Sequence, residues 1–433
     1  MTVSATQLSG VAGSPEPAAE AVPRFAATPE AFLAELEEFA AFGARTRRET
    51  LSLPSGRSIP VFLNEFWTAR QRQAHRLHEI SYRACFKPQL PRFFLERLTR
   101  PGDVVYDPFG GRGTTAIEAA LHGRVPWSVD INPLSIVLTR PRLTPVTGAD
   151  IARRLEEIDF AAAGERPEEL LVFYHPETLR EICALRRHLL KRRATGAFDP
   201  VDGWIQMVAA NRLTGHSAGF FSVYTLPPNQ ATSVAAQKRI NARRRQVPPR
   251  REVPALILRK ARRLLAALTG DERARLAKAG ARARLLAASA DDTPQLPPAT
   301  ARLVVTSPPF LNAVNYKFDN WLRGWFCGID LDAVPLWQSP DLLQWEQAME
   351  RVFRELRRLL TPGGWVAFEV GEVRKGEVLL EKHVCAAAER AGLEPVGVLI
   401  NAQEFTKTSN CWGITNQRRG TNTNRVSLLR RTN

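Results

Sequence analysis

The sequence predicts an α/β fold in which helices pack on both faces of a mainly parallel sheet and a largely helical segment interrupts the chain. Two short apolar runs, at 104–106 and 303–305, have the composition of buried parallel strands, and each leads into a loop rich in Gly or Pro. Between them, residues 146–280 show helical patterns and little that resembles a strand. The chain has 433 residues, of which 44% are hydrophobic, so it has enough apolar material for a large core.

The N-terminal part is expected to begin with a tail and to continue into the main domain. Residues 1–25 are rich in Ala, Pro, Ser and Gly without apolar periodicity, which predicts a disordered tail. Helical patterns begin near Pro29, and a helix-like run over 86–98 leads through a turn into the strand at 104–106. The first part of the main domain is therefore predicted to span 26–145.

A glycine-rich loop, DPFGGRGTT at 107–115, follows the first buried strand and precedes a helix over 116–121. In an open α/β sheet, ligands bind at the carboxyl ends of the strands, and glycines there let the backbone approach a ligand closely. The alternative is a plain tight turn. The next strand, 127–129, ends at Asp130, whose carboxylate is suited to accept both ribose hydroxyls of a nucleoside or, alternatively, to cap a helix that begins at 131–133.

Residues 281–433 are predicted to complete the sheet as the second part of the main domain. The strand at 303–305 is followed by an amphipathic helix over 342–360, which ends at the sequence TPGG, residues 361–364. Three further strands are expected, at 365–370, 395–400 and 426–429.

A second motif, TSPPF at 306–310, ends the strand at 303–305, again at the carboxyl edge of the sheet. Two consecutive prolines have no N–H to donate, so we expect their carbonyls and the neighbouring Ser307 side chain to face the cleft. Such acceptors can hold an exocyclic amino group while its nitrogen attacks an electrophile, and Phe310 can stack on a base swung out of its duplex. The alternative for Pro-Pro alone is a proline-rich strand end.

These motifs resemble those of the S-adenosylmethionine-dependent methyltransferases that modify exocyclic amino groups of DNA bases. The loop at 107–115 is similar to their Asp-Pro-Phe-x-Gly-x-Gly-Thr-Thr cofactor loop, and 306–310 is similar to their catalytic Ser/Asp/Asn-Pro-Pro-Tyr/Phe motif. Upstream, residues 85–90 resemble the segment that covers the methionine end of the cofactor. The resemblance covers about 86–130 and 288–429, and it implies a Rossmann-like methyltransferase sheet.

The resemblance also implies a role for each matching residue. The residues implied to bind S-adenosylmethionine are Phe86, Pro88, Asp107, Pro108, Phe109, Gly111, Gly113, Thr114, Thr115, Asp130 and Asp291. Near the cofactor adenine, either Ser289 or Asp291 is the equivalent of the family's acidic residue. The residues implied to be catalytic are Ser307, Pro308, Pro309 and Phe310, with Ser307 holding the target amino group.

The same resemblance implies a site-specific methyltransferase that acts on double-stranded DNA. It leaves open whether a cognate restriction endonuclease is a further partner. Within the family, a Ser at the position of Ser307 favours cytosine N4, and an Asp or Asn favours adenine N6. Adenine N6 and an amino group of an RNA base therefore remain alternatives. A DNA-binding protein without catalysis and a small-molecule methyltransferase are disfavoured by the intact motif at 306–310.

The charge balance favours an acidic polymer as partner, because 60 Lys and Arg face 44 Asp and Glu, a formal charge of +16. Related enzymes keep their target-recognition region in an inserted segment, which here is 146–280. Between Lys238 and Arg263 it carries a basic run in which Glu252 is the only acid, formed by Lys238, Arg239, Arg243, Arg244, Arg245, Arg250, Arg251, Arg259, Lys260, Arg262 and Arg263. They are placed to follow DNA phosphates or, alternatively, to form a solvated helix face.

Two polar loops leave their roles open. The stretch from Asn211 to Gln230 carries amide, guanidinium and aromatic side chains that can read base edges or pack on the catalytic domain. The stretch 406–424, with Lys407, Arg418 and Arg419, can touch the DNA backbone or form an ordinary hairpin connection.

Cysteine spacing and hydropathy predict the setting of the protein. Five cysteines lie far apart, with no Cys-x-x-Cys pair and no Cys/His cluster, which predicts a reducing compartment and no metal site. No window approaches the roughly 18 apolar residues that cross a bilayer, and no leader pattern opens the sequence. We therefore expect a cytoplasmic protein with no membrane partner.

Overall fold

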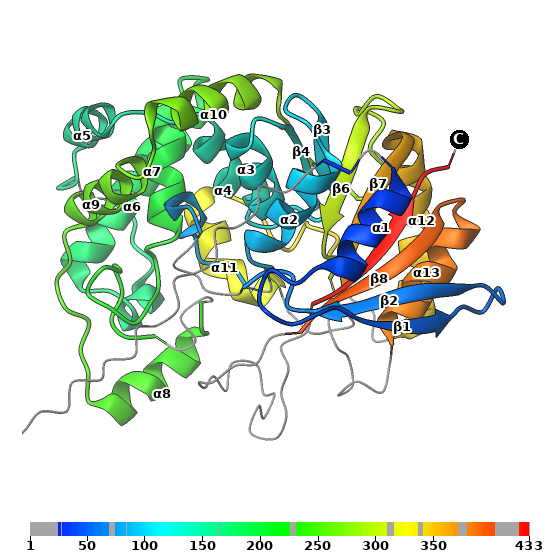
Figure 1. The fold of residues 1–433 in the computed structure, drawn as a ribbon. Helices are drawn as coiled ribbons and strands as arrows, with labels where there is room; N and C mark the ends of the chain where they lie inside the picture. The colour runs from blue at the N-terminus through cyan, green and yellow to red at the C-terminus, as the bar shows by residue number, and fades with distance from the viewer. Residues whose placement is uncertain are drawn as a thin grey trace, which may run out of the picture.

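A computed structural model gives the architecture of the chain around one central sheet (Figure 1). It describes residues 25–26, 28–68, 74–83, 85–162, 164–225, 231–309, 316–336, 341–370, 379–402 and 424–432. The nine strands of the sheet are β1 (Arg47–Ser52), β2 (Ser58–Asn64), β3 (Val104–Asp107), β4 (Val125–Asp130), β5 (Arg284–Ala287), β6 (Ala301–Thr306), β7 (Leu360–Val370), β8 (Glu394–Asn401) and β9 (Asn424–Arg430). Their spatial order is β1-β2-β8-β9-β7-β6-β3-β4-β5. The predicted tail lies almost wholly outside the described residues.

Strand directions bring the two motifs to one edge of this sheet. Strands β5, β4, β3, β6 and β7 are mutually parallel, whereas β9 lies antiparallel between β7 and β8. The loop at 107–115 follows β3 and the motif at 306–310 follows β6, and these two strands are direct neighbours. The motifs therefore leave the sheet side by side.

Helices cover both faces of the sheet, as the sequence predicts. One face packs on α12 (Leu342–Leu359) and α13 (Leu380–Arg390), whose core includes Phe353 and Val384. The opposite face packs on α1 (Pro29–Glu38) and α2 (Gln89–Leu98), whose core includes Phe32 and Phe94. The fold is thus a Rossmann-like α/β sandwich whose sheet has one antiparallel strand inside it, β9, and another at its edge, β1.

Two details of the sequence prediction need correction. The helix predicted over 342–360 is α12, which ends at Leu359, just before the TPGG sequence at 361–364. The strand predicted at 365–370 begins earlier, at Leu360, which pairs with Ala301 of β6. Residues 361–364 form an irregularity within β7, where Gly363 has a positive φ of 71°. The helix-like run over 86–98 begins later, at Gln89, directly after Pro88.

The hairpin β1–β2 was not predicted, because five of the six β1 residues are exposed and carry no apolar alternation. This hairpin extends the sheet at the edge formed by β8, which β2 joins in parallel.

The segment predicted as a helical insertion is built mainly from helices, most of which pack around one shared core. They are η3 (Glu168–Val172), α5 (Gly148–Glu156), α6 (Pro176–Ala194), α7 (Pro200–Ala210), α8 (Val234–Arg244), α9 (Val253–Leu265) and α10 (Gly270–Arg282). Their shared core includes Trp204, Ile182 and Ile257, and it continues onto α3 (Thr114–Leu121), α4 (Leu134–Leu143) and α11 (Tyr316–Cys327). Figure 1 shows these helices beside the sheet, next to α4 and α11.

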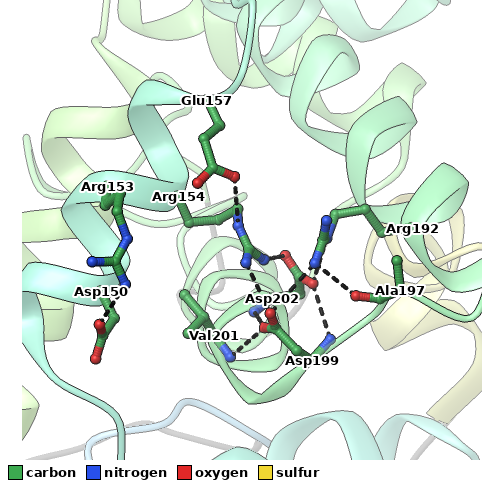
Figure 2. A network of polar contacts seen from close by, with 9 residues as sticks. All are labelled: Asp150, Arg153, Arg154, Glu157, Arg192, Ala197, Asp199, Val201 and Asp202. Atoms are coloured by element: carbon green, nitrogen blue, oxygen red, sulfur yellow. Dashed lines mark hydrogen bonds and ion pairs between the residues drawn. The ribbon is translucent and has the colours of Figure 1, made fainter.

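A network of ion pairs holds three of these helices together (Figure 2). Asp202 of α7 is fully buried, and it accepts hydrogen bonds from Arg154 of α5 and, at 2.7 Å, from Arg192 of α6. Asp199 pairs with Arg154 at 2.8 Å. Hydrogen bonds to Asp199 and Asp202 raise the pKa of Arg154, so the guanidinium stays charged at this helix junction.

Within the described ranges, no helix combines the length and the apolar character needed to cross a membrane. The same part of the chain contains no group of three His, Cys, Asp or Glu side chains placed to hold a metal ion.

Candidate active site

A pocket lies at the carboxyl ends of β3, β4 and β6, where both motifs leave the sheet. It encloses about 890 Å³ of empty space, including its open mouth. It is lined by Tyr82, Cys85, Phe86, Asp107, Pro108, Phe109, Gly110, Gly111, Arg112, Thr114, Asp130, Ile131, Asn132, Ser289, Ala290, Ser307, Pro309 and Leu336. The loop at 107–115 thus forms the floor, and five other chain segments form the walls.

Two glycines let the loop lie tightly against its neighbours. A Cβ on Gly110 would stand 2.1 Å from Ser128 Oγ of β4, and a Cβ on Gly113 would stand 2.2 Å from Thr139 Oγ1 of α4. Gly113 also has a φ of 75° and forms the N-cap of α3. Gly113 does not line the pocket, so its requirement is structural, whereas Gly110 lines it and was not singled out from the sequence.

Asp107 lies at the floor of the pocket and is almost fully buried. Its Oδ1 accepts a hydrogen bond of 2.6 Å from Thr306 Oγ1 and one of 3.1 Å from the backbone N–H of Phe109. Burial raises the pKa of Asp107 to about 7, against the opposing effect of these hydrogen bonds. A positively charged ligand bound beside this carboxyl would therefore favour its loss of a proton.

Asp130 stands at the end of β4 and fits both alternatives raised by the sequence. Its Oδ1 accepts the N–H of Asn132 at 2.8 Å, which caps the turn before α4. Its Oδ2 accepts the N–H of Gly111 at 2.7 Å, and the side chain also lines the pocket. Burial raises the pKa of Asp130 to about 6. One carboxylate thus orders the loop and faces the cavity.

Arg112 fastens the segment that covers the pocket. Its guanidinium donates hydrogen bonds to the backbone carbonyls of Ile80 at 2.9 Å, His78 at 3.3 Å and Phe86 at 3.4 Å. These bonds hold the wall that carries Tyr82 and Phe86 over the loop. The sequence offered no local signal for this role, because the partners lie about 30 residues upstream.

At the strand end of β5, the structure separates the two candidates near the expected adenine position. Ser289 lines the pocket, and its hydroxyl donates to Asp291 Oδ1 at 2.5 Å. Asp291 lies outside the lining, and its Oδ2 pairs with Arg351 Nε at 3.0 Å. Asp291 therefore reaches the pocket only through Ser289.

Ser307 and Pro309 bring the second motif to the pocket, and Glu369 of the neighbouring strand β7 backs it. A hydrogen bond from the Ser307 side chain reaches the Glu369 carboxylate, which also accepts from Asn424 Nδ2 at 3.1 Å. Burial raises the pKa of Glu369. The Pro309 carbonyl accepts the indole N–H of Trp345 at 3.0 Å, which fixes the turn against α12. Glu369 was not singled out from the sequence.

Not every residue named from the sequence lines the pocket. Phe86, Asp107, Pro108, Phe109, Gly111, Thr114, Asp130, Ser307 and Pro309 do, whereas Pro88, Gly113, Thr115, Asp291 and Pro308 do not. Thr115 instead donates its hydroxyl to the Val305 carbonyl at 3.0 Å. Phe310, Lys407, Arg418 and Arg419 lie outside the described residues.

The chemistry of the lining fits S-adenosylmethionine. Two carboxyl groups, the buried Asp107 and the half-buried Asp130, suit a cation and ribose hydroxyls, and Phe86, Phe109 and Ile131 provide apolar surface for an adenine ring. The amide nitrogen of Asn132 is buried and has no hydrogen-bond partner among the described residues, so a donor is left for a ligand acceptor.

Comparison with known proteins shows what one part of the chain is similar to. Residues 48–139 match a family model of the N6/N4 methyltransferases, described as DNA methylase. The Type II methyltransferase M.MvaI of Kocuria varians is 31% identical over 117 residues, and M.MjaII of Methanocaldococcus jannaschii is 34% identical over 74 residues. Residues 48–139 are thus similar to the N6/N4 DNA methylases, in agreement with the resemblance of the loop at 107–115, whereas the motif at 306–310 lies beyond the matched residues.

These matches cover only parts of each protein. The matched stretches are 26% and 17% of this chain, and 24% and 14% of the two relatives. The solved structure of TrmN from Thermus thermophilus is 14% identical and covers 84% of this chain and 52% of that one, with a TM-score of 0.32. A likeness with that identity and TM-score says nothing about the function of this chain.

Proposed function

We propose that this chain is a site-specific DNA methyltransferase that transfers a methyl group from S-adenosylmethionine to an exocyclic amino group of a flipped base, cytosine N4. The observation that carries the proposal is that the loop at 107–115 and Ser307 line one pocket. The family match at 48–139 supports the reaction class and includes the first motif, whereas the second motif lies beyond it.

Residues of the floor and walls would hold the cofactor. Asp130, Gly111 and Asn132 offer polar groups at the end of β4, and Phe86 and Phe109 offer aromatic surface. When bound, S-adenosylmethionine supplies an electrophilic methyl group on a positively charged sulfur. In the floor of the pocket, that charge would favour the ionised form of the buried Asp107 carboxyl.

Ser307 and Glu369 would handle the target amino group. Because the Ser307 hydroxyl hydrogen is committed to Glu369, the Ser307 oxygen is left as an acceptor for an amino N–H. This bond would orient the nitrogen lone pair toward the methyl carbon. As the N–C bond forms and the C–S bond breaks, the nitrogen must lose a proton. Glu369, whose pKa is raised by burial, would accept that proton through the Ser307 hydroxyl.

The choice of base rests on the resemblance at Ser307, which favours cytosine N4 over adenine N6. Both curated relatives are Type II methyltransferases, and this observation favours a restriction–modification role with a cognate endonuclease. We further propose that residues 146–280 recognise the target sequence.

Transfer of a labelled methyl group to duplex DNA tests the proposed function. The wild-type chain should label duplex DNA, and Ser307→Ala should abolish transfer while leaving cofactor binding nearly intact by calorimetry. Labelling of RNA but not of DNA would move the chain to the RNA alternative. Full transfer by Ser307→Ala would remove Ser307 from its assigned role.

A further inference from the structure

The helix α8 presents a face made only of cations and alanines. Its exposed residues Lys238, Arg239 and Arg243 stand on the same side as Ala235 and Ala242. No acidic residue occurs from 231 to 251, and none of the three cations forms an ion pair within the described part of the chain. Exposed cations that have no acidic partner on the protein favour the binding of an external anion.

The inner face of α8 is anchored by polar groups instead of an apolar core. Gln237 Nε2 donates to the Tyr224 carbonyl at 3.1 Å and to Asn241 Oδ1 at 2.7 Å, and Asn241 Nδ2 donates to the Val172 carbonyl at 2.7 Å. Arg244 lies over the Tyr224 ring at 3.8 Å from its centroid. These directional bonds fix the rotation of the helix, so its outer cations point away from the molecule.

The start of α8 is tied to the segment that follows the second motif. Just before the helix, the N–H of Ala231 donates to the Asp319 carbonyl at 3.2 Å, and the indole of Trp321 donates to the Thr232 carbonyl at 3.3 Å. Asp319 and Trp321 belong to α11, the first described element after Ser307. In Figure 1, α8 projects on the side of the molecule toward which β6 runs. The helix α8 therefore lies on the side of the sheet to which β6 and its parallel neighbours run.

We propose that α8 binds the phosphates of duplex DNA next to the flipped base, through Lys238, Arg239 and Arg243. This inference rests on the proposed function, because it takes the substrate to be a DNA duplex. Lys238 and Arg243 are separated by about 7.5 Å along the helix axis, so their long side chains can reach neighbouring phosphates of one strand. The alanines at 235 and 242 leave room for the helix to approach the DNA backbone closely.

The chain offers a matched control on α10, which lies near the amino ends of β3 and β4, away from the candidate active site. In α10, Arg275, Lys278 and Arg282 are also exposed, also number two Arg and one Lys, and form no ion pair among the described residues. They line a separate cavity with Gly102 and Val125, at the starts of β3 and β4. Neutralising either trio changes the net charge equally, so only the location differs.

The experiment compares K238Q/R239Q/R243Q with R275Q/K278Q/R282Q in the full chain. Binding to a DNA duplex of mixed sequence is measured by anisotropy over a series of salt concentrations, and S-adenosylmethionine binding is measured on the same samples as a test of folding. The α8 variant should bind DNA at least about tenfold more weakly, with a salt slope smaller by up to about 2.7, while the α10 variant stays near wild type.

Three outcomes would overturn the proposal. The first is an equal loss of DNA affinity in both variants, and the second is an unchanged salt slope in the α8 variant. The third is an α8 variant that loses affinity for duplex RNA, used as a competitor, but keeps its affinity for DNA. These outcomes differ from failure of the proposed function. In that case the wild-type chain itself would transfer no methyl group to DNA, whichever helix is altered.

Discussion

Thr306 donates its hydroxyl to Asp107 Oδ1 at 2.6 Å, and this bond joins the two motifs at the bottom of the pocket. Thr306 ends β6 directly before Ser307, and Asp107 ends β3 directly before the glycine-rich loop. Both side chains are buried. The floor on which the cofactor would rest and the turn that would hold the base are therefore one hydrogen-bonded unit.

Cofactor affinity should increase with pH. Burial raises the pKa of Asp107 to about 7 and that of Asp130 to about 6, so both carboxyls become neutral as the pH falls through this range. In the unliganded protein, raised pKa values contribute stability at low pH, which is lost as the pH rises from about 4 to about 7. A cationic ligand favours the ionised form, so the Kd for S-adenosylmethionine should be about tenfold lower at pH 8 than at pH 6.

Two variants assign this pH dependence. Asp107→Asn should flatten it, and Thr306→Val should move its midpoint to higher pH, because the lost hydrogen bond no longer stabilises the carboxylate. Calorimetry in buffers of different ionisation enthalpy reports the protons released. A wild-type profile in Asp107→Asn would contradict the role of this carboxyl.

Asp130→Ala should weaken cofactor binding by about tenfold or more, because it removes a lining carboxylate and frees Gly111. Asp291→Ala is the control, since Asp291 lies outside the lining and should change the Kd less. Equal effects would place Asp291 at the ligand. An unchanged Kd for Asp130→Ala would remove Asp130 from the site.

Gly113→Ala should destabilise the protein more than Gly102→Ala. Both glycines have positive φ, but a Cβ at Gly113 would collide with Thr139, whereas a Cβ at Gly102 has nothing within 4 Å. The backbone cost alone is about 1 kcal/mol, and the collision adds to it at Gly113. Thermal melting measures both variants, and similar Tm values would argue against the close approach of the loop to α4.

Asp202→Ala should lower the free energy of unfolding by about 3 kcal/mol, because it leaves Arg154 and Arg192 without their buried partner. Glu157→Ala removes an exposed partner of the same Arg154 and should cost less than about 1 kcal/mol. Urea denaturation separates the two. Equal losses would show that the junction of α5, α6 and α7 does not depend on the buried carboxylate.

The parts of the site that sequence reasoning found are those whose geometry is local. The loop at 107–115 and the turn after β6 are each set by a strand, its terminal residues and the glycines or prolines that follow. The sequence contains no sign of the roles of Arg112, Glu369 and Tyr82, because these roles depend on contacts between segments far apart in the chain. Likewise, the exposed strand β1 carries no apolar pattern, and only its pairing with β2 makes it a strand.

The most direct test of the account is mass spectrometry of nucleosides from the DNA of a methylation-free host that expresses this chain, beside a host that expresses Ser307→Ala. The account predicts N4-methylcytosine with the wild-type chain and none with the variant. N6-methyladenine would keep the reaction and overturn the assigned base. The absence of any methylated base from DNA, with a methylated base in the RNA, would contradict the central claim.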